Sequence, residues 1–432
     1  MADQNQKISS LEDENKRLRT AVEELSILND ITGAITSTQT VEKIIDLIVQ
    51  KCVKHLNVEQ GAVMLLDELD ANRPFHTLVR KQDSIMNGLP YRLDTQLTGW
   101  MLLNKAPLFT NDLFNDKRFS WGDEKSLSIH SLLCVPMLVK GKMIGLITVF
   151  NKKSAEGFQK EDQRLLSIIA AQSGQVLENA RLYQKEQALI RFQEEMRLAG
   201  DIQHKLLPSK APQIPGYEIM GKSNAAKYVG GDYFDFIPID NQNIAICLGD
   251  VSGKGIPAAL LMANLQATLR GQTAPEKSTN MCLERSNKLI YESTDEQKFA
   301  TLFYARLNFI NHKLCYCNGG HDKPYLMTRS GDVKRLGTGG IPLGFLPSYP
   351  YEEERIDFNP GDMLIIYSDG ITEAMNLKEE EFGEDRLEKI ISANPEEKPE
   401  ELIDLILKEI DAHVAKAPQM DDQTMVVLKR IS

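Results

Sequence analysis

A proline-free run from Lys160 to Leu207 constrains the fold more than any other stretch of the sequence. Only Gly174 and Gly200 interrupt its helical pattern, and Pro208 ends it. The pattern therefore predicts one long helix that joins two parts of the chain. Because helix propensity alone does not stabilise a helix of this length, the helix needs a packing partner along one face.

The second half of this run carries apolar residues at heptad spacing with charged residues between them. The residues of this seam are Leu182, Leu189, Phe192, Met196 and Ala199. Such a seam is typical of a coiled coil. We therefore predict a homodimer in which this helix packs against its twin from another chain.

A second a/d seam lies near the N-terminus, again with charged residues at the intervening positions. It consists of Ile8, Leu11, Asn15, Leu18, Val22 and Leu25. Asparagine at a core position costs stability but favours one register, typically that of a parallel dimer. The alternative is a single amphipathic helix that lies on its own domain, and we favour the dimer.

The region 28–182 has a mixed α/β pattern. Helical spacing in VEKIIDLIVQKCVKHL is followed by the strand-like GAVMLLDEL, and two further strands are predicted across the turn Lys140-Gly141-Lys142. Together with APLFTNDLFNDKRF and FQKEDQRLLSIIAAQSGQVLENARLY, these segments resemble a GAF domain. The resemblance implies an antiparallel sheet flanked by helices that senses a small-molecule or protein ligand.

Part of the GAF-like region matches the NKFDE signature of cyclic-nucleotide-binding relatives. The matching residues are Asn151, Lys152, Phe158 and Asp162, whereas Gln163 stands where the signature has glutamate. Because similar residues occur in GAF domains without this ligand, a cyclic nucleotide is not the favoured interpretation.

Four apolar, strand-like runs in the C-terminal half each adjoin an aspartate. These aspartates are Asp232 in GGDYFDF, Asp250 in LGDVSGKG, Asp369 in YSDGITEAMN and the pair Asp421 and Asp422 in MDDQTMVVL. Glycines beside them allow sharp turns and close approach of a ligand. The stretch Gly230 to Ala263 alone is equally compatible with two turns that expose their aspartates, but four such junctions in one domain predict a shared site.

Clustered carboxylates need cations to stay ionised, because like charges raise one another's pKa. All-oxygen ligands, with no histidine or cysteine beside these motifs, favour Mg²⁺ or Mn²⁺ over Zn²⁺. The sequence therefore predicts a magnesium or manganese site.

The same half of the chain resembles the PPM family of metal-dependent serine/threonine phosphatases, in its SpoIIE/RsbU-like branch. The resemblance includes, in family order, GGDYFDF, LGDVSGKGIPAALLMA, FATLFYARL, YCNGGHDKPYL, GGIPLGF, YSDGITEAMN, EFGEDRL and DDQTMVVL, after the lead-in RLAGDIQHKLLP. It implies a β-sandwich flanked by α-helices, with the metals between the sheets at one edge.

The resemblance also implies catalytic roles for individual residues. Asp232, Asp250, Asp369 and Asp421 correspond to metal ligands, with Asp250 bridging two Mn²⁺ or Mg²⁺ ions and the Val251 carbonyl as a further ligand. Asp422 is expected to lie next to the metal ligands without binding a metal itself. In such a site the ions acidify a water that attacks the phosphorus in line.

The proton donor is not identified by the motifs. Many eukaryotic PPM enzymes have a histidine two residues after the bridging aspartate, and here Ser252 occupies that position. A metal-bound water is one alternative. His321 in NGGHDKP is another, although we interpret it as a structural histidine at a strand end.

Charge and composition limit the partners. The formal net charge of -11 argues against nucleic acid and anionic membranes as partners, and no apolar run has the length of a membrane span. The six cysteines are scattered and mostly lie in apolar runs, as expected of free thiols in a reducing compartment. We predict a cytoplasmic protein.

The sequence therefore predicts an α+β multidomain protein. Its parts are a coiled-coil helix (1–27), a GAF sensor domain (28–182), a coiled-coil linker helix (183–208) and a PPM-type phosphatase domain (209–432). The resemblance to RsbU-like proteins implies that the substrate is a phosphoserine or phosphothreonine on a STAS-type anti-anti-sigma protein. The alternative is a non-catalytic signalling scaffold whose phosphatase-like domain only binds partners.

Overall fold

The structure is a computed structural model that describes residues 40–66, 75–81, 91–118, 129–295 and 298–432, with isolated helical positions nearer the N-terminus. The chain forms two compact units, Met1–Ile190 and Arg191–Ser432. The division falls within the long helix α4 (Lys160–His204). None of the described helices is both long and apolar enough to cross a membrane.

The first unit contains an antiparallel sheet with the strand order β2-β1-β5-β4-β3. Its strands are β1 (Val58–Leu66), β2 (Phe75–Lys81), β3 (Leu108–Thr110), β4 (Leu132–Val139) and β5 (Lys142–Lys152). Strands β4 and β5 meet at the predicted turn, where Lys140 and Gly141 have φ of 48° and 80°. The antiparallel sheet predicted for this region is confirmed.

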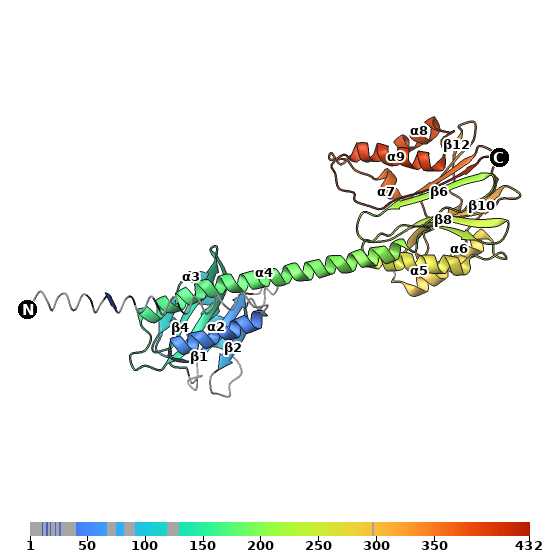
Figure 1. The fold of residues 1–432 in the computed structure, drawn as a ribbon. Coiled ribbons are helices and arrows are strands. Elements are labelled where there is room, and N and C mark those ends of the chain that lie inside the picture. The colour runs from blue at the N-terminus through green and yellow to red at the C-terminus, as the bar shows by residue number, and fades with distance from the viewer. Residues whose placement is uncertain are drawn as a thin grey trace, which may run out of the picture. The chain divides into compact units, whose positions relative to one another are not determined.

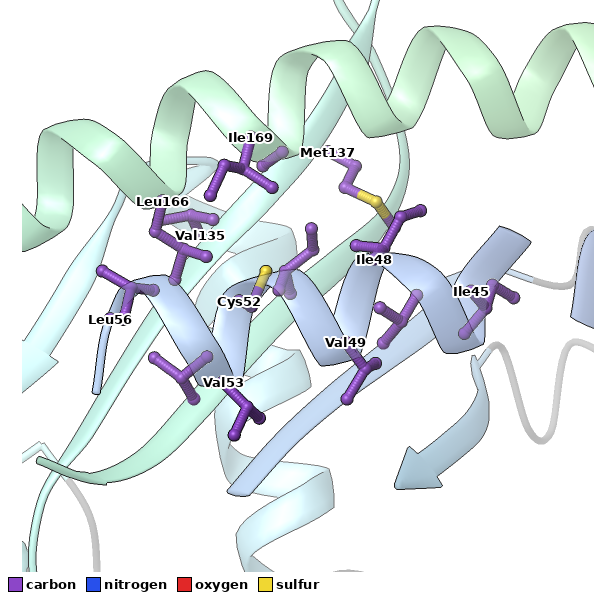
Figure 2. Close-up of a cluster of buried hydrophobic side chains, with 14 of the residues drawn as sticks. Ile45, Ile48, Val49, Cys52, Val53, Leu56, Val135, Met137, Leu166 and Ile169 are labelled. Atoms are coloured by element: carbon purple, nitrogen blue, oxygen red, sulfur yellow. The ribbon is translucent and has the colours of Figure 1, made fainter. Parts of the chain in front are cut away.

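Helices α2 (Val41–His55) and α4 cover one face of this sheet, and α3 (Tyr91–Asn104) belongs to the same unit. Figure 2 shows how the apolar side of α2 meets side chains of β4 and α4. The spacing of three and four residues along α2 places these side chains on one face. The buried residues drawn there include Ile45, Ile48, Val49, Cys52, Val53, Val135, Met137, Leu166 and Ile169.

The NKFDE-like residues hold this unit together. Lys152 Nζ lies 2.7 Å from Asp162 Oδ1 and donates to the Leu56 carbonyl at 2.8 Å. Asn151 Nδ2 donates to Glu59 Oε2 at 2.7 Å. These contacts join β5 to α4 and to the end of α2, so the residues have structural partners without any bound nucleotide.

Helix α4 confirms the predicted long helix, and its two halves differ in burial. Its first half packs on the sheet through residues such as Leu166, Ile169 and Leu177. From Leu182 onward its large apolar side chains are exposed: Leu182, Tyr183, Leu189, Ile190, Phe192, Leu198 and Ile202. The described residues do not cover this surface, and the coiled coil stays a prediction.

The N-terminal seam is described only in part. Leu11, Asn15, Leu18 and Val22 are helical and exposed, whereas Ile8 and Leu25 lie outside the described residues. The second predicted coiled coil therefore also stays a prediction.

The second unit is a sandwich of two sheets (Figure 1). One sheet has the order β13-β10-β9-β8-β7, with β14 also paired to β10, and the other has the order β12-β11-β15-β16-β6. The strands of the first sheet are β7 (Tyr233–Pro238), β8 (Asn243–Val251), β9 (Ala300–Asn308), β10 (Lys313–Gly319), β13 (Gly339–Gly340) and β14 (Glu354–Asp357). Those of the second are β6 (Tyr217–Asn224), β11 (Tyr325–Met327), β12 (Val333–Arg335), β15 (Met363–Tyr367) and β16 (Gln423–Arg430).

Helices cover the outer face of each sheet, as Figure 1 shows. Helices α5 (Ile256–Gln272) and α6 (Thr279–Ser293) pack on the first sheet. Helices α7 (Asp369–Thr372), α8 (Glu384–Ala393) and α9 (Pro399–Val414) pack on the second. The predicted β-sandwich flanked by α-helices is confirmed.

Strand β8 shows why this sequence forms an inner and an outer layer. Side chains alternate between the two faces of a strand. Ile244, Ile246 and Leu248 join the core between the sheets, whereas Ala245 and Cys247 join the core beneath α5 and α6. Both faces of β8 are therefore apolar, and the polar Asp250 occurs only near its end.

Candidate metal centre

The predicted aspartates meet at one edge of the sandwich. Asp250 lies near the end of β8, Asp369 begins α7 directly after Ser368, and Asp421 and Asp422 directly precede β16. All four line a cavity of about 310 Å³. These aspartates come from both sheets and lie about fifty to one hundred and seventy positions apart in the sequence. They share one site, as the strand–aspartate pattern predicted.

Gly231 brings the backbone of the first motif against the second. A Cβ atom at Gly231 would lie 3.0 Å from Asp250 Oδ1 and 3.2 Å from the Val251 carbonyl oxygen. A larger residue there would crowd the oxygens that the sequence predicts as ligands. Glycine therefore leaves the space beside Asp250 open.

Asp422 holds the loop that precedes β7. Its carboxylate accepts hydrogen bonds from the backbone N–H groups of Ala226 at 2.8 Å and Gly231 at 2.6 Å. The side chain is buried, and its oxygens face the backbone of this loop. This arrangement explains how Asp422 can shape the cavity without holding a metal.

Asp232 is buried beside the cavity with an unsatisfied oxygen. No described side chain or backbone group donates to its Oδ2. Burial raises its pKa well above the usual range, the Asp250 charge raises it further, and the Thr424 and Ser368 hydroxyls oppose this shift. Since a buried carboxylate oxygen without a donor is unfavourable, Asp232 suits a site that a cation completes at Oδ2.

Asp250 and Asp369 also have raised pKa values. Burial, followed by the charges of Asp369, Asp421 and Asp422, raises the pKa of Asp250 to about 7. Burial and the Asp421 charge raise the pKa of Asp369. Because hard divalent cations favour ionised oxygen ligands, this donor set fits Mg²⁺ or Mn²⁺.

The carboxylates are not all within ligating distance of one common point. Among the described residues, no three histidine, cysteine, aspartate or glutamate side chains form a closed group of metal ligands. Asp421 instead forms an ion pair with Lys254, with 2.7 Å between Oδ2 and Nζ. Lys254 is a functional candidate that the motifs alone did not single out.

Ser252, at the position of the eukaryotic histidine, and the alternative donor His321 both have hydrogen-bonding partners. Ser252 Oγ accepts a hydrogen bond from the Phe299 N–H at 3.0 Å. His321 is buried, and burial lowers its pKa to about 4. Its Nδ1 lies 2.9 Å from the Thr301 hydroxyl, which itself lies 3.3 Å from both the N–H and the carbonyl oxygen of Asp250. His321 therefore supports the backbone at Asp250, as expected of a structural histidine.

The end of α4 contacts the loop that carries the first motif. Gln203 Nε2 donates to the Gly230 carbonyl at 2.7 Å, and the Gly230 N–H donates to Gln203 Oε1 at 3.0 Å. A Cβ atom at Gly200 would clash with the Tyr228 carbonyl oxygen. The motif RLAGDIQHKLLP contains both Gly200 and Gln203, but its periodicity indicates only a helix and not this contact.

Fold and site together define a PPM-type protein phosphatase unit, and the comparisons with known proteins agree. The model of the stage II sporulation protein E (SpoIIE) family matches residues 240–431, and that of the GAF domain matches residues 38–178. The chain belongs to the SpoIIE/RsbU-like family of PPM protein phosphatases and carries a GAF domain.

Individual relatives support this membership. Phosphoserine phosphatase RsbU of Bacillus subtilis is 30% identical over 256 residues, which cover 57% of this chain and 75% of RsbU. Protein IcfG of Synechocystis is 29% identical over 263 residues, which cover 55% of this chain but only 41% of IcfG. The SiaA PP2C domain of Pseudomonas aeruginosa matches in fold, with a TM-score of 0.50, 17% identity and coverage of 56% of this chain and 98% of that domain.

Proposed function

We propose that this chain is a protein-serine/threonine phosphatase that hydrolyses phosphoserine or phosphothreonine at a two-metal centre. The observation that carries the proposal is the meeting of three strand–aspartate junctions at one cavity, together with the buried and unsatisfied Asp232 Oδ2 of the fourth. The relative RsbU, which is named a phosphoserine phosphatase, supports the substrate class.

The proposed ligands are Asp232, Asp250, Asp369, Asp421 and the Val251 carbonyl, with two Mn²⁺ or Mg²⁺ ions. Such ions, when bound, supply Lewis acidity and a nucleophilic water for in-line attack on phosphorus. The protein orients these ligands through Asp422, which holds the loop at Gly231, and through Thr301, which contacts the backbone of Asp250. The cavity of about 310 Å³ has room for a phosphoryl group.

The proposed substrate is a phosphorylated STAS-type anti-anti-sigma protein. Its dephosphorylation would start the partner switching that releases a sigma factor. The similarity to RsbU supports this assignment. The six free cysteines, five of them buried, suit the reducing cytoplasm that we propose as its location.

Removal of the metal is the first test of this function. We expect the chain with Mn²⁺ to release phosphate from a phosphoserine STAS protein, and excess EDTA to abolish the release until Mn²⁺ is restored. Titration calorimetry should show two Mn²⁺ per chain. Phosphate release that survives full chelation would contradict the mechanism, and absence of Mn²⁺ binding would favour the non-catalytic scaffold.

We further propose that α4 links the state of the GAF domain and of a homodimer to the phosphatase unit. The exposed apolar residues from Leu182 onward support a dimer seam, because large unpacked apolar surfaces commonly mark interfaces. Gln203 supports the coupling, since its two hydrogen bonds hold Gly230 beside the proposed ligands. A shift of α4 would therefore move Gly230 and change the geometry of the metal centre.

Two substitutions in α4 should separate dimerisation from this coupling. Leu189→Asp should convert the dimer to monomer and change phosphatase turnover, because it places a charge in an apolar seam. Gln203→Ala should keep the dimer and lower turnover roughly fivefold, through loss of about 1 kcal/mol of hydrogen bonding at Gly230. Light scattering and phosphate release measure the two effects.

Gln193→Asp, at an exposed position outside the seam, is the matched control and should change neither mass nor turnover. An unchanged mass for Leu189→Asp would contradict the seam. Wild-type turnover in Gln203→Ala would contradict the coupling.

The proposed input is a small-molecule or protein ligand of the GAF domain. A cavity of about 260 Å³ lies between the start of α2, the end of β1 and α4. Apolar residues such as Leu65, Ile144 and Leu177 line it together with Glu42 and Arg181. Because Leu177 and Arg181 belong to α4, a ligand here would contact the helix that leads toward the phosphatase unit.

A further inference from the structure

Lys254 contacts the proposed metal ligand Asp421. Its Nζ lies 2.7 Å from Asp421 Oδ2 and donates to the Met420 carbonyl at 2.9 Å. Lys254 lines the same cavity as Asp250 and Asp369. The ammonium group therefore stands where the clustered carboxylates need positive charge.

The Lys254 side chain is held only loosely. It follows Gly253 and precedes Gly255, whose φ values of 100° and 77° form the turn before α5. The side chains of Lys254 and Asp421 are 52% and 38% exposed. Such an exposed ion pair contributes little to stability, so the lysine can change partners at low cost. The Lys429 side chain, in contrast, is held firmly, because it is buried and donates to two backbone carbonyls.

A divalent ion at Asp421 would compete with Lys254 for the same carboxylate. Two cations repel each other at this range, so occupancy of Asp421 by the ion displaces the ammonium group. The displaced ammonium group would still line the cavity that holds the substrate phosphoryl group in the proposed function. Lysine is a common phosphate ligand because its ammonium group is a compact charge with several donors.

We propose that Lys254 exchanges partners during the reaction cycle: it neutralises Asp421 in the metal-free chain and binds the substrate phosphoryl group in the metal-loaded chain. This proposal rests on the proposed function, because it assigns a phosphate-binding residue to the same cavity. It makes Lys254 both a competitor of the metal and a ligand of the substrate.

A simple surface ion pair predicts a different outcome. If Lys254 only stabilised the loop at Asp421, its removal would weaken both metal and phosphate binding or change neither. Exchange of partners instead predicts opposite changes. Metal binding should tighten because a competing cation is lost, and phosphate binding should weaken because a ligand is lost.

The test uses the full chain with Lys254→Met, which keeps the length of the side chain but removes its charge. By titration calorimetry, Mn²⁺ should bind roughly thirtyfold more tightly, as expected for loss of a unit charge about 4 Å from a divalent ion at a solvent-exposed site. With Mn²⁺ saturating, inorganic phosphate should bind roughly tenfold more weakly, through loss of one charge-assisted contact. Lys254→Arg keeps the charge and should retain most of the phosphate affinity.

Lys222→Met is the matched control, since Lys222 forms an ion pair of 2.9 Å with Asp404 at similar exposure and does not line the cavity. It should change neither affinity. Unchanged or weaker Mn²⁺ binding in Lys254→Met would overturn the competition, and unchanged phosphate affinity would overturn the phosphate role. If the wild-type chain binds no Mn²⁺, the proposed function fails together with this inference. If the wild-type chain is an active phosphatase and Lys254→Met has the same affinities for Mn²⁺ and phosphate as the wild type, only this inference is contradicted.

Discussion

Asp250→Asn is expected to lower phosphatase activity by on the order of a thousandfold or more, because it removes the proposed bridging ligand of both ions. The substitution keeps the size of the side chain, and the Thr301 hydroxyl contacts only the backbone of Asp250. The fold should therefore persist. Phosphate release with saturating Mn²⁺, together with Mn²⁺ titration, measures the effect.

The same variant should be more stable than the wild type when metal is absent. Burial and three neighbouring carboxylates raise the pKa of Asp250 to about 7, so its ionised form is unfavourable in the metal-free chain. Loss of that charge should raise the Tm in EDTA by a few degrees, as is typical where a functional site opposes stability. Asp411→Asn, at an exposed position of α9, is the control and should change neither quantity.

Activity within tenfold of wild type would show that Asp250 does not bridge the metals. A lower Tm in EDTA would show instead that Asp250 stabilises the fold, and the loss of activity would then have a structural cause.

Arg270→Met is expected to destabilise the phosphatase unit by roughly 3 kcal/mol, because it leaves the buried Asp235 carboxylate without its counter-ion. Asp235 is fully buried, and Arg270 donates to its two oxygens at 2.7 Å and 3.1 Å. The Tyr233 hydroxyl also donates to this carboxylate, at 2.7 Å. The pair therefore ties α5 to β7, directly beside the motif that contains Asp232.

Hydrogen exchange in urea, measured by mass spectrometry, can report the loss of stability in β7 and α5 alone. The measurement therefore does not assume that both units unfold together. Adding Asp235→Asn to Arg270→Met should recover part of the stability, because it removes the buried charge. Lys288→Met is the control, since Lys288 pairs with Glu292 only at an exposed position of α6 and should change stability by less than about 0.5 kcal/mol. Equal effects of Arg270→Met and Lys288→Met would contradict a buried-charge origin.

Much of the local structure follows from short-range patterns. The proline-free run corresponds to α4, the apolar run before Ser368 is β15, and the Lys140–Gly141 turn joins β4 to β5. These elements were predictable because backbone periodicity and turn geometry depend on residues a few positions apart. Boundaries of the four proposed domains and the roles of the individual aspartates stay predictions.

The seam residues have a local pattern, but their packing depends on a partner helix. Leu182 and Leu189 have heptad spacing in the sequence and are exposed in the single chain. The spacing indicates that a partner is needed, but the energy of a coiled coil comes from the second helix.

The sequence by itself determined the elements, the aspartates at their ends and the family. Only the tertiary structure decided that Lys254 meets Asp421, that Gln203 holds Gly230 and that Arg270 reaches the buried Asp235. Each of these contacts joins segments far apart in the chain or on different layers of the sandwich. The physical reason is that side-chain periodicity indicates only which face of a helix or strand is buried. Which residues pack against that face depends on how the sheets and helices pack in three dimensions.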